Sequence, residues 1–235
     1  MKIDLIGFDA DDTLWHTEIH YIQAQQALEQ LLSPWGSSKK IDKLLFDIEI
    51  DNLPRYGYGI KAFVLSMIEA AIQISGGEIS ADQIEQILGI GRDMLGTEVV
   101  LRSQVADTLQ ILSSTYRLLL LTKGDLLDQT NKVKHSGIAH YFSMVEVVND
   151  KTPETYIKVL NKYHIQPQNF LMIGNTLRSD IHPVLAIGGT AVHIPADSTW
   201  EHETVPGFDT SQNSYYRLDH MGQLTDLIAK INDAF

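Results

Sequence analysis

The chain has 235 residues, of which 44% are hydrophobic and 20% charged, and this composition is typical of a globular protein with one large domain or a core domain carrying an insertion. A formal net charge of −12 argues against nucleic acid as a partner, and the lack of Cys excludes disulfides, thiolate zinc sites and a Cys nucleophile. No apolar run is long enough to span a membrane and the N-terminus reads as a strand, so we expect a cytoplasmic protein with no membrane partner.

The first predicted element is a buried strand that ends in acidic residues. Residues 3–8 form an apolar run, and Asp9, Asp11 and Asp12 follow within four positions. In open α/β sheets the carboxyl ends of the strands form the ligand crevice, so Asp9 and Asp11 are expected at the mouth of a site. Two carboxylates about 4 Å apart repel by roughly 4 kcal/mol at an effective dielectric constant near 20, and a hard divalent cation is the simplest remedy. The alternative is a polar turn in which Asp12 or Thr13 caps a helix.

The next part of the chain reads as all helical. Apolar residues at helical spacing predict helices at about 17–32, 41–50, 63–72 and 80–88. Ser80 and Gln83 form a predicted capping box for the last of them. A loop rich in Gly and aromatic residues is expected at 53–59.

Helices and strands then alternate. Strands are predicted at 117–121, 144–148, 170–173 and 190–194, and an amphipathic helix ends the chain. Strands separated by helices indicate βαβ units and a parallel sheet. We therefore expect an α/β fold: a Rossmann-like three-layer core domain, formed by residues 1–16 and 100–235, and an all-helical cap domain at 17–99, inserted between the first two strands.

Polar groups follow several of these strands. Thr122 and Gly124 offer a hydroxyl and open backbone N–H groups at a helix start, which suits a phosphate oxygen, although Thr122 alone reads as a routine helix cap. Lys151 stands just before a helix that starts with Pro, where an ammonium group could offset developing negative charge, although a lone loop Lys is usually solvated. The fourth strand ends at Gly174 and is followed by Asn175 and Asp180.

These segments together resemble the four motifs of the haloacid dehalogenase superfamily. Residues 8–14, with the sequence Phe-Asp-Ala-Asp-Asp-Thr-Leu, resemble the first motif, and Thr122, Lys151 and residues 174–180 resemble the other three. The resemblance implies that Asp9 attacks phosphorus and Asp11 acts as general acid and base. It also implies that Thr122 binds phosphate, that Lys151 stabilises its charge, and that the first strand is central, flanked by the second and the fourth.

The resemblance further implies a Mg²⁺ cofactor, with Asp9, the backbone carbonyl of Asp11, and Asn175 or Asp180 as ligands. Two positions depart from the family pattern. Asn175 stands where the family has Asp, which predicts weaker metal binding. Lys123 stands where the family often has Asn, and it is either an additional cation beside the phosphate or a lysine that faces solvent.

The resemblance is best described as similarity to the phosphatases of this superfamily that carry a helical cap after the first motif, such as the N-acylneuraminate-9-phosphatase and phosphoglycolate phosphatase groups. It implies that the substrate is a small phosphorylated metabolite. Candidate substrate-binding residues are Thr122, Lys123, Gly124, Lys151, Arg55 and Tyr56. In the cap, Arg55 and Tyr56 would bind the leaving group of the substrate. The alternative is that the tyrosines pack on their own helices. Residues 200–203 are expected to form an ordered surface loop.

Three alternatives stay open. A 2-haloacid dehalogenase would belong to the same superfamily, but those enzymes lack the second Asp and use no metal, so Asp11 argues against it. A phosphomutase would pass the phosphoryl group to a second hydroxyl, and no sequence feature indicates this. A binding module with weakened catalysis is suggested by Asn175. The chain is expected to be a monomer or a homodimer.

Overall fold

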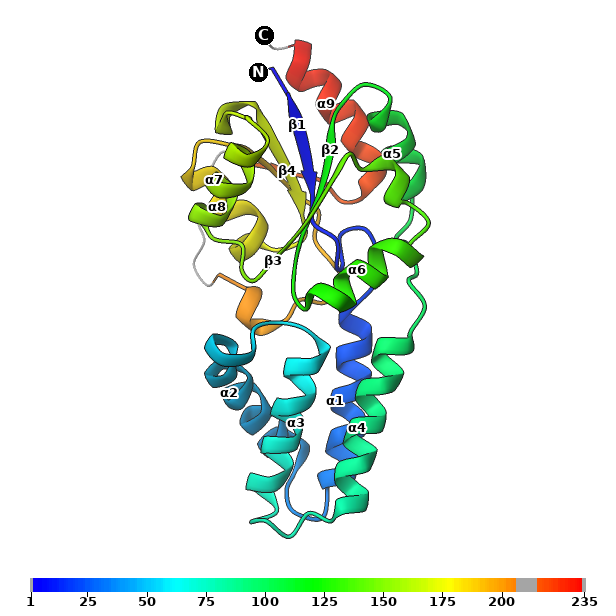
Figure 1. Ribbon diagram of the computed structural model, residues 1–235, viewed down its shortest axis with the longest axis vertical. Coiled ribbons are helices and arrows are strands. Elements are labelled where there is room, and N and C mark those ends of the chain that lie inside the picture. The colour runs from blue at the N-terminus through cyan, green and yellow to red at the C-terminus, as the bar shows by residue number, and fades with distance from the viewer. Residues whose placement is uncertain (1, 206–214, 234–235) are drawn as a thin grey trace. The chain divides into compact units, whose positions relative to one another are not determined.

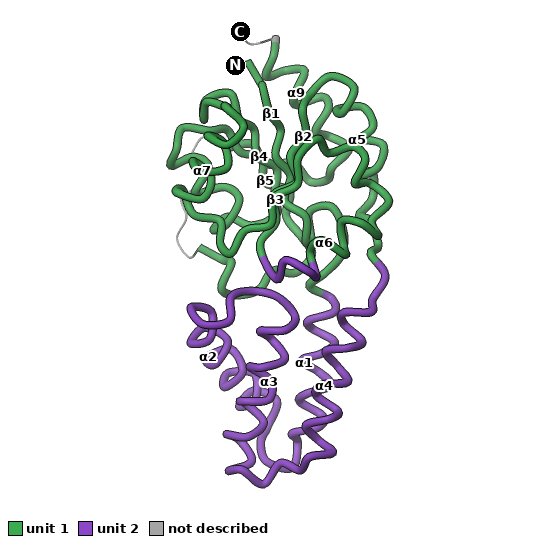
Figure 2. Tube along the Cα trace, in the orientation of Figure 1, with its two compact units in different colours: residues 1–18, 99–123, 129–235 green, residues 19–98, 124–128 purple. Residues whose placement is uncertain are grey.

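A computed structural model describes residues 2–205 and 215–233. The chain divides into two compact units, which Figure 2 distinguishes by colour. Unit 1 comprises residues 1–18, 99–123 and 129–235, and unit 2 comprises residues 19–98 and 124–128. Among the helices that the structure describes, none is long and apolar enough to cross a membrane.

Unit 1 is built on a parallel six-stranded sheet. Its strands are β1 (Leu5–Phe8), β2 (Leu118–Lys123), β3 (Met144–Val148), β4 (Phe170–Gly174), β5 (Thr190–His193) and β6 (Tyr216–Arg217). They lie in the order β3-β2-β1-β4-β5-β6, and each neighbouring pair is parallel. The predicted parallel α/β fold is confirmed, with β1 flanked by β2 and β4 as expected. The short edge strand β6 was not predicted.

Helices cover both faces of this sheet (Figure 1). The helices α5 (Val105–Ser113), α6 (Leu126–His135) and α9 (Leu224–Asp233) bury apolar residues against one face. The helices α7 (Pro153–Lys162) and α8 (His182–Ala186) cover the other. Side chains of β1 alternate between the two cores: Ile6 and Phe8 lie in the first and Leu5 in the second. Both faces of β1 are buried, so the polar residues that follow it lie beyond its carboxyl end, at the rim of the sheet.

Unit 2 contains four helices with a core of their own. They are α1 (Glu18–Leu32), α2 (Ser38–Tyr56), α3 (Ile60–Ile74) and α4 (Ala81–Gly96). Leu28, Leu45 and Met67 are among their fully buried residues. The predicted capping box at the start of α4 is present, because Ser80 accepts from the Gln83 N–H and Gln83 accepts from the Ser80 N–H.

Two helical boundaries differ from the prediction. The loop expected at 53–59 is wrong in its first half, because α2 continues through Pro54 to Tyr56. The proline ring removes one N–H donor, but the Gly57 N–H still donates to the Leu53 carbonyl, and Gly57 ends the helix with a φ of 72°. Helix α4 extends to Gly96, well beyond the predicted end.

Candidate active site at the carboxyl ends of the strands

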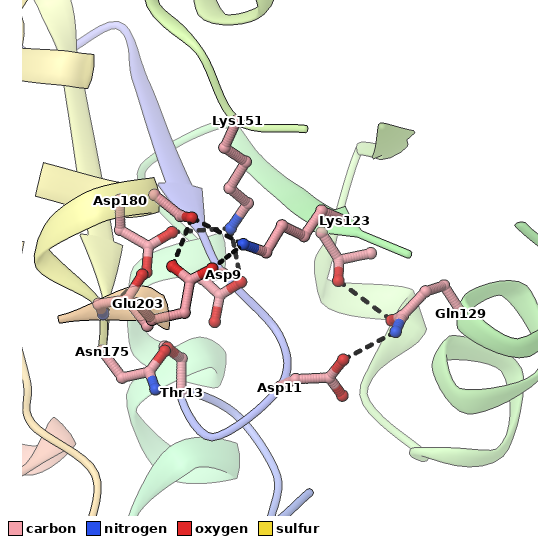
Figure 3. Close-up of polar contacts among 12 residues, drawn as sticks. Asp9, Asp11, Thr13, Lys123, Gln129, Lys151, Asn175, Asp180 and Glu203 are labelled. Atoms are coloured by element: carbon pink, nitrogen blue, oxygen red, sulfur yellow. Dashed lines mark hydrogen bonds and ion pairs between the residues drawn. The ribbon is translucent and has the colours of Figure 1, made fainter. Parts of the chain in front are cut away.

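Lys151 connects two carboxylates that come from different parts of the chain. Its Nζ lies 2.5 Å from Asp9 Oδ1 and 2.7 Å from Asp180 Oδ1. Asp9 follows β1 and Asp180 follows β4, whereas Lys151 follows β3. The side chains of Lys151 and Asp180 are each only 1% exposed, so this ion pair is shielded from water. Figure 3 shows the three side chains converging.

The second oxygen of Asp9 has no protein partner. Asp9 Oδ2 is buried and accepts no hydrogen bond from any described residue. Burial raises the pKa of the Asp9 carboxyl to about 7 against the opposing effect of Lys151, and the nearby Asp180 carboxylate adds to the rise. Burial lowers the pKa of Lys151, but Asp180 and Asp9 outweigh it and leave that pKa above its ordinary value. One ammonium group thus serves two carboxylates, and a cation at Asp9 Oδ2 would relieve the remaining charge.

Asp180 is held by the backbone around it. It belongs to a π-helix at Leu177–Ile181, and its Oδ2 accepts from the N–H and the hydroxyl of Thr176, each at 3.0 Å. Gly174 makes room for this carboxylate, because a Cβ there would lie 2.2 Å from Asp180 Cγ. The Tyr156 hydroxyl donates to the Ser179 carbonyl at 3.0 Å. π-Helical turns often occur at functional sites, and this one fixes a carboxylate beside Lys151.

Asp11 is bound in a separate set of contacts. Its Oδ1 accepts from Thr17 Oγ1 at 2.7 Å and from Trp15 Nε1 at 2.8 Å, and it pairs with Lys132 Nζ at 3.2 Å. Its Oδ2 accepts from Gln129 Nε2 at 2.7 Å. Figure 3 shows the carboxylate directed toward Gln129 and away from Asp9. Burial raises the pKa of Asp11, but Lys132 and these hydrogen bonds outweigh burial and hold that pKa below its ordinary value.

Gln129 also contacts the predicted phosphate-binding residue. Its Oε1 accepts from Thr122 Oγ1 at 3.1 Å, and both side chains are buried. Gln129 and Lys132 lie three residues apart on α6 and therefore on the same face of the helix. Neither residue was predicted from the sequence. No pattern in the neighbouring sequence distinguishes them from the solvent-facing polar residues of a helix.

Comparisons with known proteins identify the family of the chain. The profile of the haloacid dehalogenase-like hydrolases matches residues 3–188, which is most of the chain. The chain belongs to this family. Human N-acylneuraminate-9-phosphatase is 26% identical over 198 residues, which cover 80% of each sequence. The predicted family membership is therefore confirmed, and the protein is a hydrolase.

Two solved structures of this family are similar to the chain. A haloacid dehalogenase-like family hydrolase from Xanthomonas campestris is 34% identical with a TM-score of 0.88, and the match covers 99% of this chain and 93% of that one. The 2-haloacid dehalogenase from Pseudomonas syringae is 21% identical with a TM-score of 0.63, covering 97% of this chain and 99% of that one. The latter likeness concerns the fold alone.

The residues at the end of β1 fit the Mg²⁺ ion that the family implies. Asp9 and Asp180 are hard oxygen donors, and Mg²⁺ is usually held by one or two carboxylates with waters completing its shell. Asp9 Oδ2 is buried and has no hydrogen-bond partner among the described residues, so it is available as a ligand for such an ion. Asn175 is buried nearby, and its Oδ1 accepts from the Thr13 hydroxyl at 3.2 Å, which turns the amide oxygen toward the turn after β1.

The four remaining residues predicted to bind substrate lie in different surroundings. Lys123, at the end of β2, is mostly buried and donates to Ser179 Oγ at 2.8 Å, so the alternative of a solvent-facing lysine is wrong. Gly124 adopts a φ of 138°, which a residue with a side chain rarely accepts. Arg55 and Tyr56 lie in α2 of unit 2, where Arg55 donates to the Asp51 carbonyl and Tyr56 to Glu69. Their role in substrate binding stays a prediction.

The surface loop expected at 200–203 needs a correction. These residues include a short 3₁₀ turn, Glu201–Glu203, in which Glu203 is only 6% exposed. Glu203 forms an ion pair with Lys123, and its Oε2 accepts from Ser179 Oγ at 2.7 Å. The sequence offered no sign of this pairing, because the two charged residues are 80 positions apart.

Proposed function

We propose that this hydrolase is a magnesium-dependent phosphatase that acts on a small-molecule phosphomonoester, such as a sugar phosphate or a nucleotide, through an aspartyl-phosphate intermediate. The proposal rests on the partners of the two carboxylate oxygens of Asp9. One of its oxygens is held by Lys151, and the other is buried without a partner among the described residues. A carboxylate can bind a cation through one oxygen and present the other to an electrophilic phosphorus atom.

The first chemical step is attack by Asp9. A bond forms between a carboxylate oxygen of Asp9 and phosphorus while the ester P–O bond breaks. Lys151 stabilises the charge that develops on the phosphoryl oxygens. Mg²⁺ held by Asp9, the Asp11 carbonyl, Asp180 and Asn175 would supply positive charge that lets the anionic phosphate approach the anionic nucleophile.

Asp11 supplies the proton transfers. Against the effect of burial, Lys132 and Gln129 lower the pKa of Asp11, so Asp11 must leave these partners to become protonated. In its protonated form it gives a proton to the leaving oxygen, so that a neutral alcohol departs. It then takes a proton from the water that attacks the phosphorus of the intermediate, and the bond to Asp9 breaks to release phosphate. Its carboxylate contacts Gln129 and Lys132, so the reaction requires Asp11 to turn from these partners toward the bound phosphoryl group.

The relationship to human N-acylneuraminate-9-phosphatase supports the phosphatase assignment. The shared fold with a 2-haloacid dehalogenase keeps that reaction as the second candidate. The 2-haloacid dehalogenases of this superfamily lack the second Asp of the first motif. Asp11 is present here, partly buried and supplied with four hydrogen-bonding or ionic partners, which favours phosphoryl transfer.

The test is release of inorganic phosphate from p-nitrophenyl phosphate and from a panel of phosphorylated metabolites, with Mg²⁺ and with EDTA. We expect turnover with Mg²⁺, none with EDTA, and none for Asp9→Asn. Mass spectrometry of acid-quenched Asp11→Asn during turnover should detect a phosphoryl group on Asp9. Chloride release from 2-chloropropionate would instead support the dehalogenase, phosphoryl transfer to a second hydroxyl would support a mutase, and no turnover of any substrate would support a binding module.

A further inference from the structure

Lys123 and Glu203 form a buried ion pair that the proposed reaction has not used. The side chain of Lys123 is 17% exposed and that of Glu203 is 7% exposed. Ser179 completes the group, since its hydroxyl accepts from Lys123 at 2.8 Å and donates to Glu203 at 2.7 Å. We call Lys123, Ser179 and Glu203 the lysine clamp. Figure 3 shows Lys123 and Glu203 beside Asp9, Lys151 and Asp180.

The topology places the clamp over the nucleophile. Lys123 is the last residue of β2, and Ser179 lies on the π-helix that follows β4. The strand β1 lies between β2 and β4, and neighbouring strands are about 4.8 Å apart. A side chain that starts on β2 and ends at Ser179 therefore passes the carboxyl end of β1, where Asp9 stands. Lys151 crosses the same strand end from β3, so two ammonium groups meet there.

Glu203 determines where the ammonium group of Lys123 lies. Burial raises the pKa of Glu203, but Lys123 outweighs burial and the Ser179 hydrogen bond adds to its effect, so the carboxyl stays ionised. Figure 3 shows the carboxylates of Asp9 and Asp180 beside Lys123, so a lysine released from Glu203 could pair with them. Pairing with Asp9 would occupy the oxygen that has no partner and would neutralise the nucleophile.

The family motifs do not account for the two charged residues of the clamp. Glu203 lies beyond residues 3–188, which the family profile matches, and Lys123 stands where the family often has Asn. A buried ion pair often adds little to the stability of a fold, because the free energy lost on desolvating two charges is about as large as the free energy gained from their attraction. The placement of this pair beside the nucleophile therefore calls for a functional reason.

We propose that Lys123 is a second phosphate-binding cation of this site and that Glu203, together with Ser179, is the positioning residue that keeps its ammonium group over Asp9 without pairing with it. The inference rests on the proposed phosphatase function and deepens it. The site then takes the dianionic phosphoryl group between two lysines. Phosphate affinity should depend on Lys123, and through it on Glu203.

The experiment measures KM and kcat for p-nitrophenyl phosphate and the inhibition constant of inorganic phosphate at saturating Mg²⁺. Lys123→Met should raise KM and the phosphate inhibition constant about 10- to 100-fold, with a smaller change in kcat. Glu203→Gln should raise the same constants about tenfold and lower kcat, because the released lysine pairs with Asp9. Glu201→Gln, an exposed residue of the same turn, is the matched control and should match the wild type.

The double variant Lys123→Met/Glu203→Gln guards against misfolding, because it leaves no buried charge unpaired. It should melt near the wild-type temperature and retain the weak phosphate affinity of Lys123→Met. If either variant lacking Lys123 binds phosphate within twofold of the wild type, the lysine clamp has no part in binding, while the phosphatase assignment stands. If the wild type hydrolyses no phosphomonoester, the assignment fails and the inference fails with it.

Discussion

Gln129 donates a hydrogen bond of 2.7 Å to Asp11, although the two residues are 118 positions apart. The other end of the same amide accepts from Thr122. One side chain thus joins the predicted phosphate-binding hydroxyl to the predicted general acid. An amide can do this because its carbonyl accepts while its NH₂ group donates. Movement of Asp11 toward a substrate therefore requires that the Gln129–Asp11 hydrogen bond break. Gln129 also holds Thr122, so this movement affects both residues.

The first prediction concerns this bridge. Gln129→Leu should lower kcat about 10- to 100-fold, because small misplacements of catalytic groups cost up to about two orders of magnitude. It should also lower the free energy of unfolding by about 1–3 kcal/mol, the usual cost of leaving a buried polar partner unsatisfied. Steady-state kinetics and urea unfolding measure both effects. Asn131→Ala on the exposed face of α6 is the control, and equal effects of the two changes would contradict a role for the bridge.

The sequence was sufficient for five of the six strands of the sheet but not for the short edge strand β6 or for the contacts that link the loops. Buried strands such as Leu118–Lys123 are recognisable because their apolar runs and the periodic helices between them are local patterns. The motif residues Asp9, Lys151 and Asp180 were found because each follows a strand and matches a motif of the family that the sequence resembles, and a parallel sheet brings strand ends together. Gln129 and Glu203 were missed, since a polar residue in a helix or a loop has no local pattern that reveals its partner.

Local propensity also misplaced some boundaries. A loop was expected from residue 53, yet α2 keeps its last turn and Arg55 and Tyr56 lie within it. Helices were expected between the strands, whereas after β4 the chain first forms a π-helix from Leu177 to Ile181. The wider turn there is fixed by tertiary contacts: Tyr156 binds the Ser179 carbonyl and Lys151 binds the Asp180 carboxylate. Such contacts have no signature in neighbouring residues.

The second prediction concerns the pH dependence of stability without metal. Burial raises the pKa of Asp9 from 3.8 to about 7 in the folded protein. The folded state therefore binds a proton more tightly than the unfolded state. The stabilisation from that proton is complete below about pH 3.8 and is lost as the pH rises through 7. In EDTA, the wild type should become less stable between pH 5 and pH 8.

Asp9→Asn removes this effect, because an amide does not titrate and leaves Lys151 paired with Asp180 alone. The melting temperature of Asp9→Asn should exceed that of the wild type at pH 8 by several degrees, and by less at pH 5. Added Mg²⁺ should narrow the gap at pH 8 by stabilising the wild type. Asp93→Asn, at an exposed position of α4, should show no such pH dependence. A gap that is the same at both pH values would contradict the burial argument.

The third prediction concerns Asn175, where the family has Asp. Asn175→Asp should lower the Mg²⁺ concentration for half-maximal activity about 5- to 10-fold, because a carboxylate binds a hard cation more strongly than an amide does. The Thr13 hydroxyl can donate to either side chain, so the local geometry should persist. Without metal, the added negative charge should lower the melting temperature at pH 8. Asn175→Ala should shift the Mg²⁺ dependence in the opposite direction, and an unchanged dependence in both variants would place residue 175 outside the metal site.

The last prediction concerns the glycine at the end of β4. A Cβ on Gly174 would lie 2.2 Å from Asp180 Cγ and 2.3 Å from Asp180 Oδ2, distances at which the carboxylate must move. Gly174→Ala should therefore separate Asp180 from Lys151 and Thr176 and lower kcat/KM about 100-fold, with a raised Mg²⁺ requirement. Its melting temperature should also fall, because the added methyl group has no free space in the buried surroundings of Asp180.

Removal of the colliding side chain separates the steric effect from the catalytic one. Gly174→Ala/Asp180→Ala should regain most of the lost melting temperature, since no carboxylate then meets the new methyl group, but it should not regain activity. Gly89→Ala, within α4 and in open surroundings, is the control for the glycine substitution. It should raise stability by up to about 1 kcal/mol and leave activity unchanged, because Ala is the better helix former. If Gly174→Ala alone keeps full activity, Asp180 does not need the position it has beside Lys151.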